Sequence, residues 1–199
     1  RSLHLVSVAR AARRRVAPSV AGDDRAKVSL SVHRLMNRFL KPDYASNCFS
    51  NIPSTLTRLL TGQGATPIPP DPKFSRRYDS VILILVDAFG CRFFEKYCDS
   101  YPFLKRFTQE GSVLKLTSQF PSTTAAHITT LHTNLPVGQS GVFEWQYYEP
   151  SVDAMIMPLM FSFVGTRERE TLRQAKADPK LIYPQSTFYD ALNAQGIAS

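Results

Sequence analysis

Residues 81–86, VILILV, form a continuous apolar run that ends at Asp87. A run of this length without alternating polar residues is typical of a strand covered on both faces, as in a parallel sheet. Helical patterns follow through Tyr97, and again from Phe103 to Glu110. We therefore expect a buried parallel strand followed by two helical segments.

The rest of the chain continues this alternation of strands and helices. Residues 112–120 alternate like a strand, and a helix is predicted from Thr124 to Thr133. This order predicts an α/β protein with helices packed on the faces of a sheet. The other expected elements are an amphipathic piece over 36–47, a capped helix over 51–62, a strand over 154–164 interrupted by Pro158, an exposed helix over 166–176, a capped helix over 184–196 and the start of a buried strand at 197–199.

The first methionine, Met36, marks a change in composition. Residues 1–35 hold eight Lys and Arg against two Asp, and so carry most of the net charge of +8. This composition fits a transit peptide, sequence upstream of a natural start at Met36, or a mobile arm. We expect residues 1–35 to be a basic leader that is disordered or not native, and residues 36–199 to form the folded domain.

Charge and composition narrow the class of protein. The excess of positive charge lies in the leader, so we do not expect a nucleic acid as a specific partner. No run approaches the roughly 20 apolar residues of a membrane helix, and 43% hydrophobic residues predict a globular domain. The three cysteines form no disulfide framework, which favours reduced thiols and a cytoplasmic location: Cys48, Cys91 and Cys98.

Two oxygen-bearing side chains are expected at the carboxyl end of the sheet, where α/β proteins bind their ligands. Asp87 follows the apolar strand directly, and from the residues alone it is either a ligand-holding group or a cap for the next helix. Thr124 lies in the first turn of the helix 124–133, where backbone N–H groups favour a phosphoryl group. A divalent metal would activate its hydroxyl, and hard oxygen ligands suit such a metal.

The neighbours of Thr124 have less certain roles from sequence alone. Thr123 is expected to cap or support the helix. His127 lies three residues beyond Thr124, where it would either reach a bound phosphate or face solvent. His132 falls nearer Ala125 and Ile128, which predicts core packing. The five-residue spacing of the two histidines separates their rings, so this helix alone does not predict a paired metal site.

These residues carry a resemblance to a known family. VILILVDAFG (81–90) and FPSTTAAHITTLHTNLPVGQSG (120–141) resemble the two motifs of the type I phosphodiesterase/nucleotide pyrophosphatase family, within the alkaline phosphatase superfamily. Residues 41–60 are similar to the segment that precedes them in bacterial members. Three positions depart from the family pattern: Asn134 stands where Gly is usual, Ser140 replaces a common His, and His127 takes the place of an Asn that contacts phosphate in the nucleotide pyrophosphatases.

The resemblance implies a fold, a reaction and a site. The fold is an alkaline phosphatase-like three-layer sandwich with a mostly parallel sheet, of which residues 36–199 form the N-terminal part, truncated at the C-terminus. The reaction is metal-dependent hydrolysis of phosphodiester or pyrophosphate bonds in a phosphate-ester or nucleotide-like small molecule. Thr124 is implied as nucleophile and metal ligand, Asp87 as metal ligand, and His127 as a substrate contact.

The implied cofactors are two divalent metal ions, zinc by analogy, whose remaining ligands are expected beyond Ser199. Without those ligands this chain is expected to be inactive by itself, because zinc sites use three or four protein ligands. The alternatives are a phosphomonoesterase or mutase of the same superfamily, or a non-catalytic relative that keeps the scaffold. A sulfatase is disfavoured, because its Cys/Ser-x-Pro-x-Arg pattern does not occur.

Overall fold

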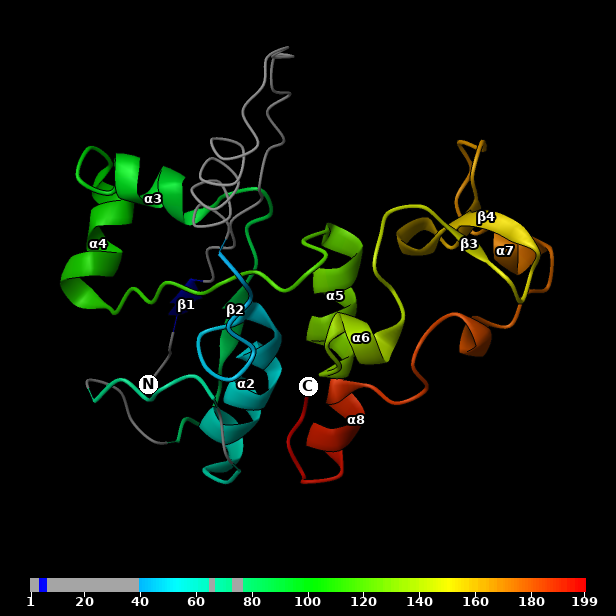
Figure 1. Ribbon diagram of the computed structural model, residues 1–199. Helices are drawn as coiled ribbons and strands as arrows, with labels where there is room; N and C mark the ends of the chain where they lie inside the picture. Colours follow the sequence, from blue (N-terminus) through cyan, green and yellow to red (C-terminus); the bar gives the residue numbers. More distant parts are fainter. Residues whose placement is uncertain (1–3, 7–39, 65–66, 73–76) are drawn as a thin grey trace, which may run out of the picture.

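The computed structural model describes residues 4–6, 40–64, 67–72 and 77–199 (Figure 1). Most of the predicted leader, and residues 36–39 of the predicted amphipathic piece, lie outside the described residues; residues 40–47 of that piece form turns rather than a helix. Within the described ranges, every helix falls short of the length and apolar character needed to cross a membrane.

The described elements are helices and short strands. In order they are β1 (His4–Val6), the 3-10 helix η1 (Phe49–Asn51), α2 (Ile52–Thr61), β2 (Ile82–Ile84), α3 (Cys91–Tyr97), α4 (Pro102–Glu110), α5 (Thr124–Thr133), α6 (Val137–Ser140), β3 (Tyr147–Glu149), β4 (Ala154–Met157), η2 (Pro158–Met160), β5 (Ser162–Phe163), α7 (Thr171–Gln174), η3 (Pro179–Leu181) and α8 (Phe188–Asn193).

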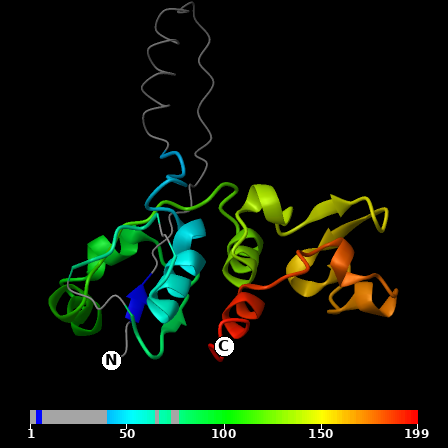
Figure 2. The ribbon, with the colours of Figure 1, turned by 90° about the horizontal axis from the view of Figure 1, so that it is seen from below.

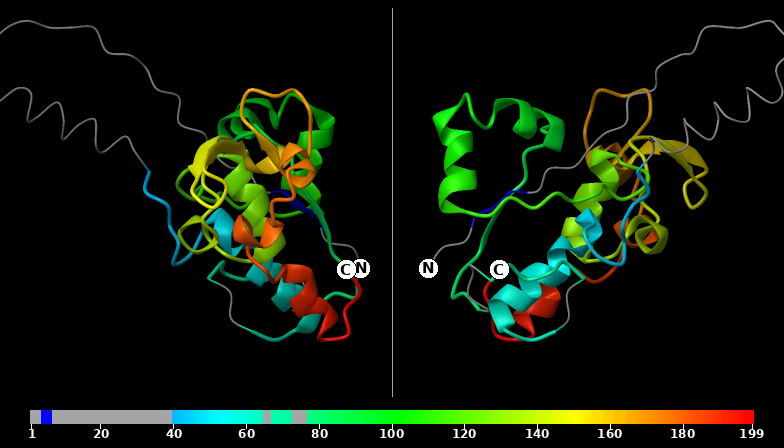
Figure 3. Two further views of the ribbon diagram at one scale, coloured as in Figure 1. Left: turned by 90° about the vertical axis from the view of Figure 1, so that its right-hand side faces the viewer. Right: turned by 60° about the vertical axis from the view of Figure 1, so that its left-hand side comes forward.

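Three helices form the centre of the molecule. Figures 1 and 2 show α2, α5 and α8 side by side, and side chains from all three meet in one apolar cluster. Phe49 and Ile52 are nearly or fully buried there, and Val81, Leu83 and Leu85 pack against the cluster from the strand segment. The helices α3 and α4 lie on one side of this centre and the strands β3 to β5 on the other (Figures 1 and 3).

The strand predicted over 81–86 is present but is covered on one face. It pairs with β1 in parallel, with Leu5 opposite Leu83. Alternate residues point away from the core and are about half exposed: Ile82, Ile84 and Val86. The prediction of a strand buried on both faces is therefore wrong for the described residues. The pairing also involves three residues of the predicted leader, whose assignment as a disordered or non-native segment stays a prediction.

A second, smaller apolar cluster lies behind the antiparallel strands. The strand order is β3–β4–β5, and Pro158 ends β4 as predicted, because a proline cannot donate to the strand ladder. Ile156 and Leu172 are fully buried in this cluster. The predicted helix over 166–176 is reduced to the single turn α7, and its Leu172 faces the core instead of solvent.

Two other predicted strands do not form. Residues 112–120 make one isolated bridge, between Thr117 and Cys48, and residues 197–199 have no strand partner among the described residues. The sheets that the structure describes are a two-stranded parallel pair and a three-stranded antiparallel sheet. The chain is thus a mixed α/β protein, and the expected three-layer sandwich around a mostly parallel sheet is not shown.

Candidate functional site

Asp87 lies at the end of the β2 segment, at a sharp turn. The next residue, Ala88, has a φ of 58°, in the left-handed region that residues other than glycine rarely adopt. The Ala88 N–H donates to Asp87 Oδ1 at 2.9 Å, which fixes the carboxylate relative to the turn. The Asp87 side chain is exposed, with its second oxygen, Oδ2, directed towards the start of α5.

The helix α5 begins as the sequence predicts. Thr123 is the N-cap, and its hydroxyl accepts the Ala126 N–H at 3.3 Å and donates to the Phe143 carbonyl at 3.0 Å. The prediction that Thr123 caps the helix is therefore confirmed. At the other end Asn134 takes a left-handed φ of 59°, which explains why the family pattern favours glycine there.

The structure brings the two predicted site residues together. Thr124 Oγ1 donates a hydrogen bond of 3.1 Å to Asp87 Oδ2, across 37 positions of sequence. Thr124 is the first residue of α5, so its hydroxyl and the Asp87 carboxylate both lie at the helix end where N–H groups and the helix dipole attract anions. This end of α5 with Asp87 is the candidate site.

The distance between these two oxygens can be compared with the distance between two ligands of one metal ion. Two oxygens bound to one tetrahedral zinc at about 2.0–2.2 Å lie roughly 3.3–3.6 Å apart. The observed separation of 3.1 Å is close to this range, so a small movement would let both atoms bind one ion. Among the described residues, no cluster of three His, Cys, Asp or Glu side chains is arranged to hold a metal. The fit of a metal ion to this site therefore rests on two oxygen donors, Asp87 Oδ2 and Thr124 Oγ1.

His127 is buried behind the site rather than facing solvent. The residue is 8% exposed, and the rings of His127 and Phe49 form a T-shaped pair with centroids 4.2 Å apart. The ring Nδ1 lies 2.6 Å from the Thr123 carbonyl oxygen, and Nε2 lies 2.9 Å from Ser118 Oγ. Burial lowers the pKa of His127, while the bond to Thr123 and the charge of Asp87 oppose this effect. Both ring nitrogens thus have protein partners. A direct contact between His127 and substrate stays a prediction.

The other histidine of α5, His132, does not lie where the sequence predicted. His132 is exposed and lies against Tyr189 of α8, with ring centroids 5.5 Å apart, so the prediction that it packs in the core is wrong. A helix turns by about 100° per residue, and five residues therefore place the two histidines on different faces. The face that carries His127 is the one that packs against η1.

Sequence reasoning missed Gln119, which holds the segment before the site. Its side chain is 1% exposed, and its amide nitrogen donates to Ala126 O at 3.1 Å and to Thr130 Oγ1 at 2.8 Å. Its amide oxygen accepts the Val137 N–H at 3.3 Å. The alternating pattern places Gln119 on the face opposite Leu116, so the sequence carries no signal for the burial of this amide.

Residues 43–49 support the same segment from the opposite side. The Asp43 N–H donates to Thr117 Oγ1 at 2.8 Å, and the Phe120 N–H donates to the Tyr44 hydroxyl at 3.0 Å. The backbones of Asn47 and Phe49 also bond to Thr117. The two parts of the chain that resembled the family in sequence are thus joined by hydrogen bonds, and together they hold residues 117–123 in front of α5.

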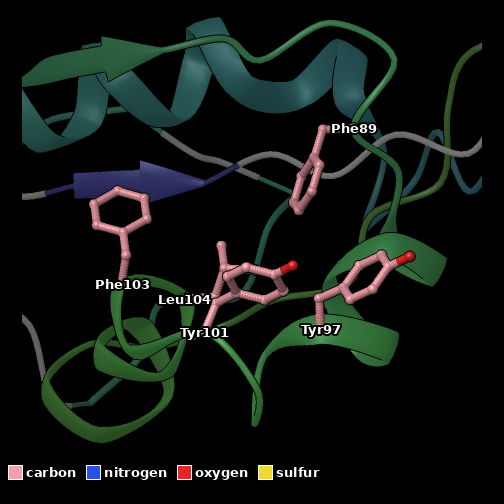
Figure 4. Close-up of a pocket in the computed structure, with 5 residues that line it drawn as sticks. All are labelled: Phe89, Tyr97, Tyr101, Phe103 and Leu104. Carbon is pink, nitrogen blue, oxygen red and sulfur yellow. The ribbon is translucent and has the colours of Figure 1, made fainter.

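An aromatic cleft of about 280 Å³ lies beyond the turn at Asp87 (Figure 4). Phe89 follows Asp87 by two residues and forms one wall, and the other lining residues come from α3, α4 and the N-cap of α4: Tyr97, Tyr101, Phe103 and Leu104. Phe103 and Tyr101 are more than half exposed. The apolar lining of this cleft therefore begins two residues after Asp87 in the sequence.

A helix-start threonine faces a strand-end carboxylate on a mixed α/β scaffold, an arrangement that suits the binding of a phosphoryl group. Comparison with known families makes this assignment specific: residues 81–197 match the type I phosphodiesterase/nucleotide pyrophosphatase family, and the chain belongs to that family. The family implies an alkaline phosphatase-like fold and hydrolase-type chemistry on phosphate esters or nucleotides. Neither a curated protein nor a solved structure matched the chain.

Proposed function

We propose that the protein hydrolyses phosphodiester or pyrophosphate bonds, with Thr124 as the nucleophile and Asp87 and Thr124 as ligands of a divalent metal. The observation that carries this proposal is the 3.1 Å hydrogen bond from Thr124 Oγ1 to Asp87 Oδ2 at the start of α5. The reaction class is that of the family to which the chain belongs. The alkaline phosphatase-like sandwich is proposed on the same ground, with residues 36–199 as its N-terminal part.

The positions of these groups suit attack on phosphorus. The start of α5 attracts the substrate phosphoryl group, and the Thr123 cap fixes the direction in which the helix N–H groups point. Thr124 Oγ1 then forms a bond to phosphorus while the bond from phosphorus to the leaving oxygen breaks; the hydroxyl proton of Thr124 passes to solvent water, and the leaving oxygen takes up a proton from solvent water. Water hydrolyses the resulting phosphothreonine and restores the Thr124 hydroxyl.

A divalent metal, when bound, would lower the pKa of the attacking hydroxyl and stabilise negative charge on the phosphoryl oxygens. Asp87 would hold such an ion next to Thr124, and the Ala88 N–H fixes the Asp87 carboxylate for this role. Two oxygen donors bind zinc weakly, because zinc sites use three or four protein ligands. We propose that two zinc ions bind and that ligands other than Asp87 and Thr124 complete their coordination.

The test uses the complete natural protein with bis(p-nitrophenyl) phosphate, a diester, and p-nitrophenyl phosphate, a monoester. We expect diester turnover that chelation removes and added zinc restores. Thr124→Ala should lower kcat by about a thousandfold or more, the scale seen when a catalytic nucleophile is removed. The control Thr133→Ala, at the far end of α5, should leave kcat unchanged.

The other outcomes separate the alternatives. If Thr123→Ala abolishes turnover and Thr124→Ala does not, the nucleophile has been assigned one residue too late. Turnover of the monoester alone would indicate a phosphomonoesterase. Stoichiometric zinc without turnover of either ester would indicate a non-catalytic relative.

A further inference from the structure

We propose that His127 is a positioning residue: its imidazole, neutral and protonated at Nδ1, ties residues 118–123 to the first turn of α5 and so holds Thr124 in front of Asp87. This inference rests on the proposed function, because it assigns Thr124 the reacting hydroxyl. It concerns a side chain buried behind the site, and three contacts of its ring carry the argument.

The first contact fixes the tautomer. His127 Nδ1 lies 2.6 Å from the carbonyl oxygen of Thr123, the residue before the proposed nucleophile. A carbonyl oxygen only accepts hydrogen bonds, so Nδ1 must carry a proton. The same oxygen also accepts the His127 backbone N–H at 3.1 Å. One residue thus binds the N-cap carbonyl twice, through its main chain and through its ring, which restrains the peptide plane that leads into Thr124.

The second contact lies on the other side of the ring. His127 Nε2 is 2.9 Å from Ser118 Oγ, and in a neutral ring with Nδ1 protonated this nitrogen accepts. The Ser118 hydroxyl therefore donates to Nε2. Ser118 Oγ also lies 2.6 Å from Ser122 Oγ and 3.1 Å from the Gln119 carbonyl oxygen. These contacts link Ser122, Ser118, the imidazole and Thr123 in one hydrogen-bonded chain.

This hydrogen-bonded chain closes the segment that precedes the proposed nucleophile. Its members, Ser118, Ser122 and Thr123, flank Phe120 and Pro121, and His127 connects both ends of the segment to α5. Hydrogen bonds are stronger where water is excluded, and this holds at the imidazole, because His127 is 8% exposed, whereas Ser122 is exposed. Rotation of Thr123 or Thr124 would break the chain at the Thr123 carbonyl.

The remaining contacts keep the ring in place. The Phe49 ring packs edge-on against the imidazole at 4.2 Å, and Phe49 is itself 1% exposed. The Phe49 N–H donates to Thr117 O at 2.9 Å, so the packing partner is tied to the same segment. An enclosed ring with both nitrogens bonded to protein acts through its neighbours, and Thr124 is the neighbour proposed to react.

The first measurement needs no turnover. Imidazole ¹⁵N shifts of uniformly labelled protein should show His127 protonated at Nδ1 and an unprotonated, hydrogen-bonded Nε2. Ser118→Ala should move the His127 Nε2 signal and leave its Nδ1 signal nearly unchanged. The exposed His132 is the reference ring, and its signals should not respond. A His127 ring protonated only at Nε2, or charged on both nitrogens in the folded protein, would overturn the proposal.

The second measurement is steady-state turnover of the diester by the complete protein. His127→Phe keeps the aromatic contact with Phe49 and removes both polar contacts, so kcat should fall by about tenfold to a hundredfold, as when groups that orient a reactive centre are removed. KM should stay within about twofold of the parent, because a ground-state substrate contact is not lost. His132→Phe, on the same helix, should change neither constant.

Rescue separates positioning from a general loss of fold. His127→Asn places an amide N–H near the position of Nδ1 and should restore most of kcat. Equal loss in the Asn and Phe variants would overturn the inference, and so would a rise in KM with unchanged kcat, which would indicate a direct substrate contact. If Ser118→Ala abolishes turnover while Thr124→Ala does not, Ser118 is the nucleophile and the proposed function fails. Turnover unaffected by Thr124→Ala, with the expected tautomer, would refute the proposed function alone.

Discussion

Replacing Gln119 by methionine should destabilise the protein more than any nearby surface change. The buried amide makes hydrogen bonds to Ala126 O, Thr130 Oγ1 and the Val137 N–H. Methionine has nearly the same length but offers none of these bonds. Gln119 sits between Ser118 and Phe120, so its loss also loosens the segment in front of Thr124.

The three hydrogen-bond partners of Gln119 are not affected equally by its replacement with methionine. Ala126 O keeps its place in the α5 hydrogen-bond ladder, and the Thr130 hydroxyl can still donate to Leu135 O at 2.8 Å. The Val137 N–H starts α6 and has no intrahelical acceptor, so it is the group left buried without a partner. An unsatisfied buried donor costs about 1–3 kcal/mol and an ordinary lost bond about 1 kcal/mol, which together predict a loss of about 2–4 kcal/mol.

Urea unfolding followed by circular dichroism measures this loss. The matched control is Gln139→Met, because Gln139 is an exposed glutamine on α6 and should change the unfolding free energy by no more than about 0.5 kcal/mol. Gln119→Glu should be at least as destabilising as Gln119→Met, since it buries a carboxyl group and removes the amide donor. A loss below about 0.5 kcal/mol for Gln119→Met would refute the account of this network.

Three further predictions follow from local geometry. Thr123→Ala removes the N-cap of α5 and should cost about 1–2 kcal/mol of unfolding free energy in the same urea assay. Ala88→Gly relieves a left-handed alanine and should stabilise the protein by about 0.5–1 kcal/mol, whereas Asn134→Gly should change little because asparagine tolerates this conformation. Burial raises the pKa of Tyr147 and Tyr183 to about 12, and ultraviolet absorbance should show both side chains ionising near that pH. The stability that these two side chains contribute is complete below about pH 10 and should be lost as the pH rises through 12.

The sequence predicted the elements whose ends are encoded locally. The helix α5 has a threonine cap and an asparagine end, and both are visible as residue types before any fold is known. The same is true of α8, where Thr187 and Asp190 form a capping box, and of the break at Pro158. Each of these signals satisfies backbone groups within a few residues, so tertiary contacts did not have to be known.

The errors concern features that depend on a distant partner. Residues 112–120 alternate like a strand, but a strand also needs a neighbour, and Thr117 finds only the bridge to Cys48. The apolar run 81–86 predicts coverage on both faces, yet the described chain covers only the side of Leu83 and Leu85. His127 and His132 could not be placed because α5 carries apolar residues on several sides, and only the position of η1 decides which face is inside.

The candidate site depends both on local signals and on a contact between distant residues. Asp87 and Thr124 were each predicted from a local signal, the end of an apolar strand and the start of a capped helix. Their approach to 3.1 Å could not be computed from spacing, because 37 residues separate them. What sets that approach is the support around Thr124: Gln119 holds the preceding segment against α5, and Tyr44 and Asp43 hold it from outside. A site of this kind can therefore be recognised from its two motifs, while its precision depends on buried amides and backbone bonds that carry no motif.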